Sequence, residues 1–345
     1  MQKTINLLSD TVTHPTEEMR RAICEAQVGD DVSKADPTVN KLQKLASEMM
    51  GMEDALFVPS GTMGNLIALL CHCPAGKEVL LETDTHINKF EVGGMARVAG
   101  LMPYPIKGDK LGILDPDDVR AAIRPENVHF PAPGLLCIEN THNLGGGTVH
   151  PLEYLAQYRK IADDAGIKIH MDGARVFNAA VRQKVDVKEI VKHTDSVMFC
   201  LSKGLSAPVG SMLCGKKEFI AEAVRARKML GGGMRQAGVL AAAGILALEQ
   251  MVDRLAEDHQ TARKLAEGLN SINGISVELE GVQTNLVYLS VCAEKDAHHV
   301  GSELKEKYGI LCEVRDAVQM RMVTHRHITS EDIDYVLDCT SKIMA

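Results

Sequence analysis

The sequence predicts an α/β protein with a mainly parallel sheet, followed by a smaller C-terminal α+β domain. Two observations lead to this prediction. Over residues 20–240, short apolar runs alternate with stretches of helical periodicity, as in strands joined by crossover helices. Beyond about residue 270 the runs GISVELEG and TNLVYLSV follow a different plan. The two expected domains are residues 1–245 and 246–345, and a chain of 345 residues can bury a sizeable core.

Six apolar runs are expected to form strands of the main sheet, at 55–59, 78–82, 135–139, 168–171, 196–201 and 211–214. Helical periodicity between most of them predicts helices at 62–73, 116–122 and 151–165. In such sheets, ligands bind at the carboxyl ends of the strands. The residues that directly follow each run are therefore the candidates for function.

A different pattern is expected in the C-terminal part. Residues 238–269 are rich in Ala and Leu and predict a long helical stretch, interrupted only by isolated glycines, that links the two domains. Short strands are expected within 274–281 and 284–291, and helices over 296–308 and 330–344. These elements together predict a small α+β unit.

Composition and charge narrow the class of protein. Hydrophobic residues make up 45% and charged residues 24%, which is typical of a soluble globular protein. The net charge of −8 and the lack of a basic cluster argue against nucleic acid as a partner. We find neither an apolar run long enough to span a bilayer nor the plan of a signal peptide. Nine cysteines, many of them within apolar runs, indicate reduced thiols in a cytoplasmic protein.

The triplet Cys71-His72-Cys73 could suggest a metal site. Its spacing does not match structural zinc, and no second Cys/His pair lies nearby in the sequence. We therefore expect this triplet to be the end of a helix, and we expect no metal.

Ser60-Gly61-Thr62 follows the first strand, at the point where a helix is expected to begin. Free backbone N–H groups at a helix start can bind an anion, and Gly61 would allow close approach. The same residues are also common in turns and helix caps that bind nothing. Taken alone, this stretch leaves both interpretations open.

Two further strand ends carry charged residues. Asp172 follows the run at 168–171, and Arg175 lies three residues further on. Asp172 could cap the next element or hold a cationic group of a ligand. Lys203 stands between two apolar runs, where it could snorkel to solvent or, if buried beside cationic groups, act as an amine nucleophile.

Considered together, these strand ends match the needs of pyridoxal 5′-phosphate (PLP). Its phosphate suits the helix start, its pyridinium nitrogen suits the carboxylate of Asp172, and its aldehyde suits the amine of Lys203. A stacking group is also needed for the ring, and His86 follows the strand at 78–82. The sequence therefore predicts a PLP enzyme.

The chain also resembles the low-specificity L-threonine aldolases, which have the aspartate-aminotransferase-like fold type I of PLP enzymes. The resemblance covers nearly the whole chain. It is carried by LSDTVT (8–13), VGDDV (28–32), DPTVNKLQ (36–43), PSGTMGN (59–65), HINKFEVGG (86–94), ENTHN (139–143), HMDGARVFNA (170–179), LSKGLSAPVGS (201–211), RKMLGGGMRQAGVLAAAG (227–244) and MRMVTH (320–325). The resemblance implies cleavage of threonine or allo-threonine to glycine and acetaldehyde.

The resemblance also implies roles at matching positions. Lys203 would be the Schiff-base lysine and Asp172 the partner of the ring nitrogen. The remaining cofactor contacts implied are Gly61, Thr62, His86, Arg175, Ser202, Arg235 and Lys228. Of these, Arg235 and Lys228 are expected to reach the site of a neighbouring subunit in a homotetramer.

For the amino-acid substrate, the resemblance implies carboxylate contacts from Ser9, Arg175 and Arg321, so residues 1–15 are expected to line the site. His129 would lie near the β-hydroxyl group, and either His129 or His86 would handle its proton. For His142 and His325, structural roles are favoured over catalytic ones.

The chain departs from the family pattern at two positions, where Leu8 and Ser33 stand in place of the usual Arg and Tyr. The Ser33 departure leaves substrate preference open. Other reactions on the same scaffold stay possible, namely β-elimination, alanine racemisation and phenylserine cleavage. A non-catalytic binding protein is disfavoured because Lys203, Asp172 and Arg175 are all present.

Overall fold

The computed structural model describes residues 4–291 and 295–345. A seven-stranded sheet forms its centre, in the order β2-β8-β7-β6-β5-β3-β4. The strands are β2 (Asp54–Val58), β3 (Glu78–Glu82), β4 (Met102–Ile106), β5 (Pro133–Glu139), β6 (Lys168–Asp172), β7 (Ser196–Cys200) and β8 (Ser211–Gly215). Strand β8 is antiparallel to both of its neighbours, whereas the pairs from β7 to β4 are all parallel. The mainly parallel sheet is therefore confirmed.

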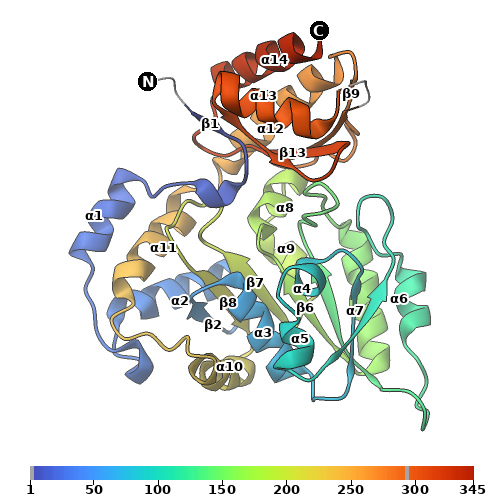
Figure 1. Cartoon of the computed structure of the whole chain (residues 1–345). Helices are drawn as coiled ribbons and strands as arrows, with labels where there is room; N and C mark the ends of the chain where they lie inside the picture. Colours follow the sequence, from blue (N-terminus) through green and yellow to red (C-terminus); the bar gives the residue numbers. More distant parts are fainter. Residues whose placement is uncertain (1–3, 292–294) are drawn as a thin grey trace.

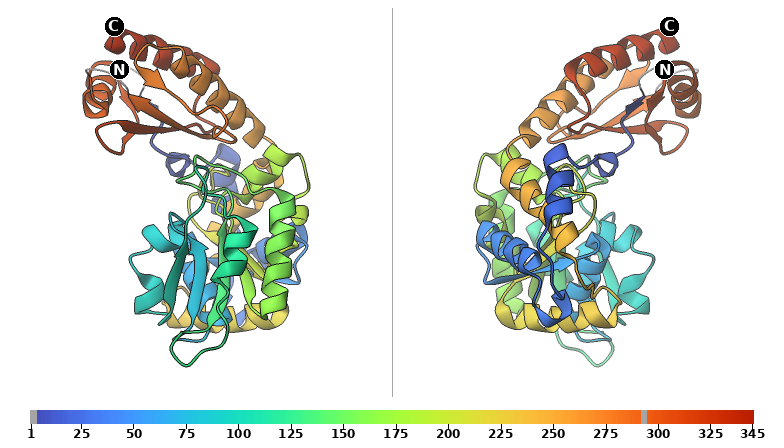
Figure 2. Two further views of the ribbon diagram at one scale, coloured as in Figure 1. Left: turned by 90° about the vertical axis from the view of Figure 1, so that its right-hand side faces the viewer. Right: turned by 90° about the vertical axis from the view of Figure 1, so that its left-hand side faces the viewer.

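Both faces of this sheet are covered by helices, as Figures 1 and 2 show. Alternate strand residues face opposite sides: Phe57 and Phe199 belong to one core, and Val58 and Met198 to another. The first face is covered by α2 (Pro37–Met50), α6 (Pro116–Ala122), α7 (Leu152–Ala165), α8 (Val176–Gln183), α9 (Val187–Val191) and α11 (Gly238–Gln250). The second is covered by α3 (Gly61–His72), α5 (Gly94–Arg97) and α10 (Lys217–Met229).

Three short elements and one helix flank this body. They are η1 (Asp10–Val12), η2 (Asp31–Ser33), α4 (His86–Lys89) and α1 (Glu17–Glu25), which packs against α11. Polar side chains cap the N-termini of α2 and α3. Asp36 accepts hydrogen bonds from the first-turn N–H groups of α2, and Ser60 Oγ accepts one from Met63 N at the start of α3.

The C-terminal part has its own sheet, in the order β12-β13-β10-β9. Its elements are α12 (Leu255–Asn270), β9 (Ile275–Ser276), β10 (Leu286–Val291), α13 (Ala297–Tyr308), β11 (Ile310–Leu311), β12 (Glu313–Val314), β13 (Gln319–Val323) and α14 (Ser330–Met344). Strand β1 (Ile5–Asn6) pairs with β11, and Ile5 and Leu7 lie in this second core. The N-terminal segment thus belongs to the upper lobe of Figure 1 before it crosses to the other.

The six expected strands are found within two residues of their predicted bounds, and so are the helices expected at 62–73, 116–122, 151–165, 296–308 and 330–344. Strand β4 was not expected, because its sequence MPYPI has two prolines and mostly accessible side chains. Proline is tolerated there because β4 is an edge strand of the sheet. The run at 274–281 forms only the two-residue strand β9.

The expected single helical stretch over 238–269 is wrong, because the chain turns between α11 and α12. Leu248 packs in the core of the main sheet, whereas Leu265 packs in the C-terminal core. One straight helix could not serve both cores. The domain boundary expected between residues 245 and 246 stays a prediction, and Leu255 still belongs to the core of the main sheet.

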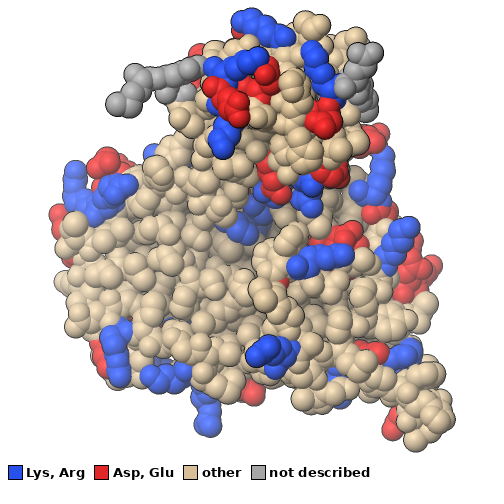
Figure 3. All heavy atoms as spheres, in the orientation of Figure 1, with Lys and Arg blue, Asp and Glu red and all other residues tan. Residues whose placement is uncertain are grey.

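Charged side chains are unevenly spread over the surface. Figure 3 shows many of them on the upper lobe and around the periphery, while a broad area left of the centre is nearly free of charge. Basic side chains are visible in the recess beneath the upper lobe. Among the helices described, none combines the length and the hydropathy required to cross a membrane.

Candidate active site

A cavity of about 380 Å³ lies at the carboxyl ends of β5, β6 and β7, beneath the C-terminal lobe. It brings together most of the residues singled out in the sequence. They are Ser9, Gly61, Thr62, His86, Asp172, Arg175, Ser202, Lys203 and Arg321. Strand ends, one helix start, the N-terminal segment and β13 therefore meet at one place, as the parallel sheet predicts.

The start of α3 forms one wall of the cavity. A Cβ atom at Gly61 would lie 3.0 Å from Met198 Cε and 3.2 Å from Cys200 Sγ, so glycine lets the helix start approach β7 closely. The first N–H groups of a helix have no partner within it, and α3 is 12 residues long. This wall can receive an anion. The phosphate contacts expected of Gly61 and Thr62 stay predictions.

Lys203 lies in the loop that joins β7 to β8, two antiparallel neighbours. The Lys203 side chain lines the cavity and its carbonyl accepts a hydrogen bond of 2.8 Å from Thr13 Oγ1. The loop returns through Gly210 at φ +101°, where a Cβ would lie 2.4 Å from Phe57 Cε2. The small residues after Lys203 therefore let this loop fold tightly over the sheet.

Asp172 ends β6 and is 2% exposed. Its Oδ1 accepts a hydrogen bond from Ala174 N at 3.1 Å, and its Oδ2 accepts one from Asn65 Nδ2 at 2.8 Å. The sequence reasoning did not identify Asn65, which is buried in the middle of α3. The available signal was an amide side chain inside an otherwise apolar helix.

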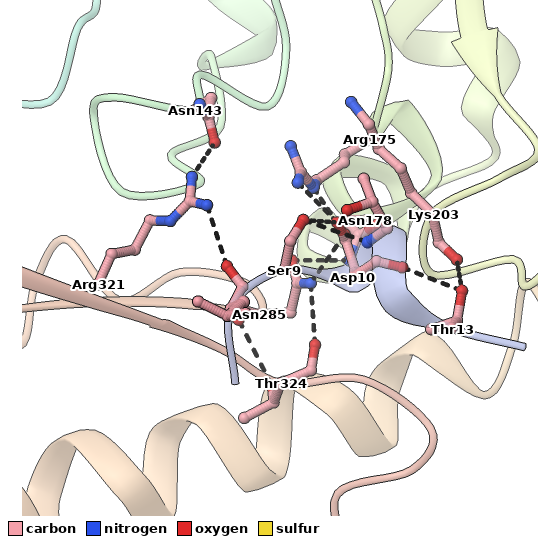
Figure 4. A network of polar contacts seen from close by, with 12 residues as sticks. Ser9, Asp10, Thr13, Asn143, Arg175, Asn178, Lys203, Asn285, Arg321 and Thr324 are labelled. Carbon is pink, nitrogen blue, oxygen red and sulfur yellow. Dashed lines mark hydrogen bonds and ion pairs between the residues drawn. The ribbon is translucent and has the colours of Figure 1, made fainter. Parts of the chain in front are cut away.

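Arg175 forms a bidentate ion pair with Asp10 of the N-terminal segment, as Figure 4 shows. The Nε and Nη2 atoms of Arg175 each donate to a carboxylate oxygen of Asp10 at 2.7 Å. Burial opposes the charge on Asp10, but the Arg175 guanidinium holds the pKa of that carboxyl well below its usual range. Asn285 Nδ2 adds a third contact at 3.2 Å. Neither Asp10 nor Asn285 was predicted.

His86 begins α4 and lines the cavity. Its Nδ1 lies 2.9 Å from Glu91 Oε1, while its backbone N–H donates to Glu139 Oε2. Burial opposes protonation of the imidazole, but the Glu91 and Asp172 carboxylates raise the pKa of His86 above its usual value. Because Glu91 is the acceptor, Nδ1 carries a proton and Nε2 is left free for a ligand. His86, Glu91 and Asp172 also offer ligand atoms within 4.8 Å of one another, although hydrogen bonds already join them.

Arg321 reaches the cavity from β13 of the C-terminal lobe. It donates to Asn143 Oδ1 at 3.2 Å and to the carbonyl of Leu8 at 3.1 Å, and it pairs with Glu313 at 2.6 Å. Leu8 therefore contributes through its backbone. Ser9 Oγ, which also lines the cavity, accepts a hydrogen bond from Thr11 N.

His129 is not among the residues that line this cavity, and its expected place near the β-hydroxyl group of the substrate stays a prediction. The residue is exposed in the loop before β5. A loop that precedes a parallel strand lies at the amino edge of the sheet, opposite the cavity. Figure 1 shows the loop between α6 and β5 extending away from the upper lobe.

Arg235 and Lys228 also lie outside the cavity lining, in and after α10. Arg235 pairs with Asp30 at 2.9 Å on the surface. Their expected contact with a neighbouring subunit stays a prediction. Ser33 is exposed in η2, and its Oγ donates to the carbonyl of Asp30 at 3.0 Å.

Three other histidines have structural partners. His142 is buried against Glu82 at 2.9 Å, and His325 Nε2 lies 2.8 Å from the carbonyl of Asn6. Helix α3 ends at His72, as expected for the Cys-His-Cys triplet, and the imidazole stacks on Phe219 with ring centres 4.3 Å apart.

The chain is similar to known proteins over most of its length. Residues 6–292 match the family model described as beta-eliminating lyase. A probable low-specificity L-threonine aldolase 2 of Arabidopsis thaliana is 45% identical over 99% of this chain and 97% of its own length. The chain belongs to the low-specificity L-threonine aldolase family.

Two more comparisons extend over nearly the full chain. The low specificity L-threonine aldolase of Escherichia coli K12 is 43% identical over 95% of this chain and 96% of its own length. Among solved structures, a threonine aldolase of Leishmania major superposes with a TM-score of 0.85 at 18% identity, over 99% of this chain and all of that one. The family resemblance inferred from the motifs is confirmed.

Proposed function

We propose that this chain is a PLP-dependent aldolase that cleaves L-threonine and L-allo-threonine to glycine and acetaldehyde. Related β-hydroxy-α-amino acids would give the corresponding aldehydes. One observation carries the proposal. Lys203, Asp172 and the start of α3 line one cavity, in a chain 43–45% identical to low-specificity L-threonine aldolases over nearly its full length.

The residues of the cavity fit this cofactor. PLP, when bound, withdraws electrons from the α-carbon of an amino acid. An amine, a carboxylate and a helix start are available for its aldehyde, ring nitrogen and phosphate. Thr141 Oγ1, buried in the lining, has no hydrogen-bond partner among the described residues, which supports a polar ligand here. Asp172 would accept from the ring nitrogen, and Lys203 Nζ would hold the aldehyde carbon.

The substrate end of the cavity would select which bond breaks. Arg321, the free edge of Arg175 and the Ser9 hydroxyl can bind the substrate carboxylate. Holding the carboxylate there would set the orientation of the substrate at the cofactor, and that orientation would decide which bond at Cα is weakened. Orientation would thus favour cleavage over racemisation at Cα.

The β-hydroxyl proton has a natural acceptor in His86 Nε2. Nδ1 is bound to Glu91, so the Glu91 carboxylate orients the ring and stabilises its charged form when Nε2 takes the proton. His86→Phe should slow cleavage while PLP stays bound. Turnover equal to wild type would exclude this role for His86.

We also propose a cytoplasmic homotetramer with shared active sites. The nearly uncharged area in Figure 3 supports a covered surface, as do the exposed side chains of Val32, Met229 and Val239. In such an assembly Arg235 and Lys228 would bind the cofactor phosphate of a neighbouring subunit. The loop of His129 would likewise meet a second copy. Free cysteines in the described chain support the cytoplasm.

The test is a product assay with purified chain and PLP. Incubation with L-threonine, L-allo-threonine, DL-phenylserine or L-alanine is followed by chromatography for glycine, aldehyde, ammonia and D-alanine. From each threonine isomer we expect equimolar glycine and acetaldehyde. The Lys203→Ala variant should show no turnover. Ammonia with 2-oxobutyrate from threonine, or with phenylpyruvate from phenylserine, would indicate β-elimination, and D-alanine would indicate racemisation. Either as the main activity would overturn the proposal.

A further inference from the structure

A row of hydrogen-bonded side chains runs from the cavity to the far end of α3. Asn65 Nδ2 donates to Asp172 Oδ2 at 2.8 Å, and Asn65 Oδ1 lies 3.1 Å from His170 Nε2. His170 Nδ1 lies 2.8 Å from Ser196 Oγ, which lies 2.8 Å from His72 Nε2. Asn65, His170 and Ser196 are fully buried. This row of hydrogen bonds connects three elements, α3, β6 and β7.

The direction of each hydrogen bond follows from its partners. Asn65 Nδ2 faces two carboxylates, Asp172 and Glu91, so this end of the amide is the donor and Oδ1 is the acceptor. His170 must therefore carry its proton on Nε2, which leaves Nδ1 as an acceptor for the Ser196 hydroxyl. Since that hydroxyl has one proton, its oxygen accepts from His72 Nε2. Every donor in the row points toward Asp172.

The two imidazoles stay neutral, which preserves this direction. Burial lowers the pKa of His170 to about 3 and that of His72 to about 4. The row therefore brings no net positive charge to Asp172. An amide donates and accepts but does not readily pass a proton on, so Asn65 separates the imidazoles from the cavity and the row orients groups rather than conducting protons.

Asn65 also joins the two sides of the cofactor site. Its Nδ2 lies 2.8 Å from Glu91 Oε1, and the same oxygen lies 2.9 Å from His86 Nδ1. One amide thus holds the carboxylate expected at the ring nitrogen and, through Glu91, the imidazole expected over the ring face. Without it, two buried carboxylates would face each other with no donor between them.

We propose that Asn65 is a positioning residue that fixes Asp172 relative to the Glu91–His86 pair. His170, Ser196 and His72 in turn fix the orientation of the Asn65 amide. This inference rests on the proposed function. Asn65 acts on the cofactor only through Asp172 and His86. Its effect should weaken along the row, from Asn65 to Ser196 to His72.

The test measures cofactor binding and its spectrum rather than turnover. Apo wild type, Asn65→Leu, Ser196→Ala and the matched control Ser211→Ala are titrated with PLP, and the visible band of each loaded protein is followed with pH. Ser211 is a buried strand serine whose Oγ contacts Cys200 outside the row. We expect Asn65→Leu to raise the Kd for PLP roughly tenfold or more and to move the pH midpoint of the band. Ser196→Ala should shift both in the same direction by less, and Ser211→Ala should match wild type.

Each outcome decides between the two proposals. Unchanged Kd and pH midpoint in Asn65→Leu would overturn the positioning role and leave the proposed function intact. If Asn65→Leu fails to fold, Ser196→Ala decides instead, and behaviour equal to Ser211→Ala would overturn the role. A wild-type chain that binds no PLP would overturn the proposed function and this inference with it.

Discussion

Two buried aspartates lie at the cavity, and the chain holds them in different ways. Among the described residues, the donors to the Asp172 carboxylate are neutral: the amide of Asn65 and the backbone N–H of Ala174, and all three residues belong to the main-sheet body. Asp10 binds the cationic Arg175 and the amide of Asn285, which come from distant parts of the chain. Asp172 is 2% exposed and Asp10 is 0% exposed, so the two aspartates do not differ in burial.

The difference shows how the two ends of the cavity are built. The end expected to hold the cofactor ring is assembled within one core, so neutral hydrogen bonds suffice to orient its groups. The end expected to hold the substrate carboxylate is assembled from η1, the start of α8 and Asn285, which directly precedes β10 of the C-terminal lobe. There a buried ion pair joins the parts, and a change in the position of the lobe would alter substrate binding more than cofactor binding.

The largest effect is expected from Asp10→Asn. The change leaves the Arg175 charge buried without its partner, which costs about 3–5 kcal/mol in comparable pairs. We expect kcat/KM for threonine to fall roughly a hundredfold, while the Kd for PLP changes less than about threefold. Steady-state kinetics and PLP titration measure the two. Asp338→Asn, which removes an exposed pair with Lys342, is the control and should change neither. An equal loss of PLP affinity in Asp10→Asn would contradict the division into two ends.

A smaller effect is expected from Asn285→Leu. Asn285 Nδ2 donates to Asp10 and also to the carbonyl of Thr324, so the change removes the link from the C-terminal lobe but keeps the ion pair. Losing one hydrogen bond to a charged group predicts a roughly tenfold rise in KM for threonine. PLP affinity should stay as in wild type. If KM is unchanged, the C-terminal lobe does not act through Asp10.

As the pH is lowered, we expect the stability contributed by the cofactor end of the cavity to be lost at a higher pH than that contributed by the substrate end. The imidazoles of His170 and His72 have pKa values of about 3 and about 4 in the folded chain, because burial disfavours their charged forms, against 6.5 when exposed. Below pH 6.5 the unfolded chain binds more protons, so stability falls as pH is lowered toward 4. Asp10 has its pKa lowered from 3.8, so its contribution persists above that pH.

The expected effect on the free energy of unfolding is about 2 kcal/mol for each ring by pH 5. Urea unfolding of the apo chain between pH 8 and 5 measures it. In His170→Asn the slope between pH 6.5 and 5 should be shallower than in wild type. Identical slopes in the two proteins would mean that His170 does not titrate as proposed.

Much of the cavity could be predicted because its residues follow strands. Asp172 and Lys203 come directly after apolar runs, and parallel strands bring such positions to one edge whatever their separation along the chain. The same rule explains why His129 is not among the residues that line the cavity, since that residue precedes β5. Family motifs alone did not reveal this, because a motif match carries no information on which side of the sheet a loop lies or which copy it serves.

The amino-acid sequence was enough to predict the strands, most of the helices, the sheet edge at which a ligand is expected and the roles proposed for Lys203 and Asp172, because periodicity and residue type are local properties. Only the tertiary structure decided that Asp10 pairs with Arg175 and that Asn65 joins Asp172 to Glu91. These partners lie 165, 107 and 26 residues apart, and a buried polar group takes whichever partner the packing brings within reach.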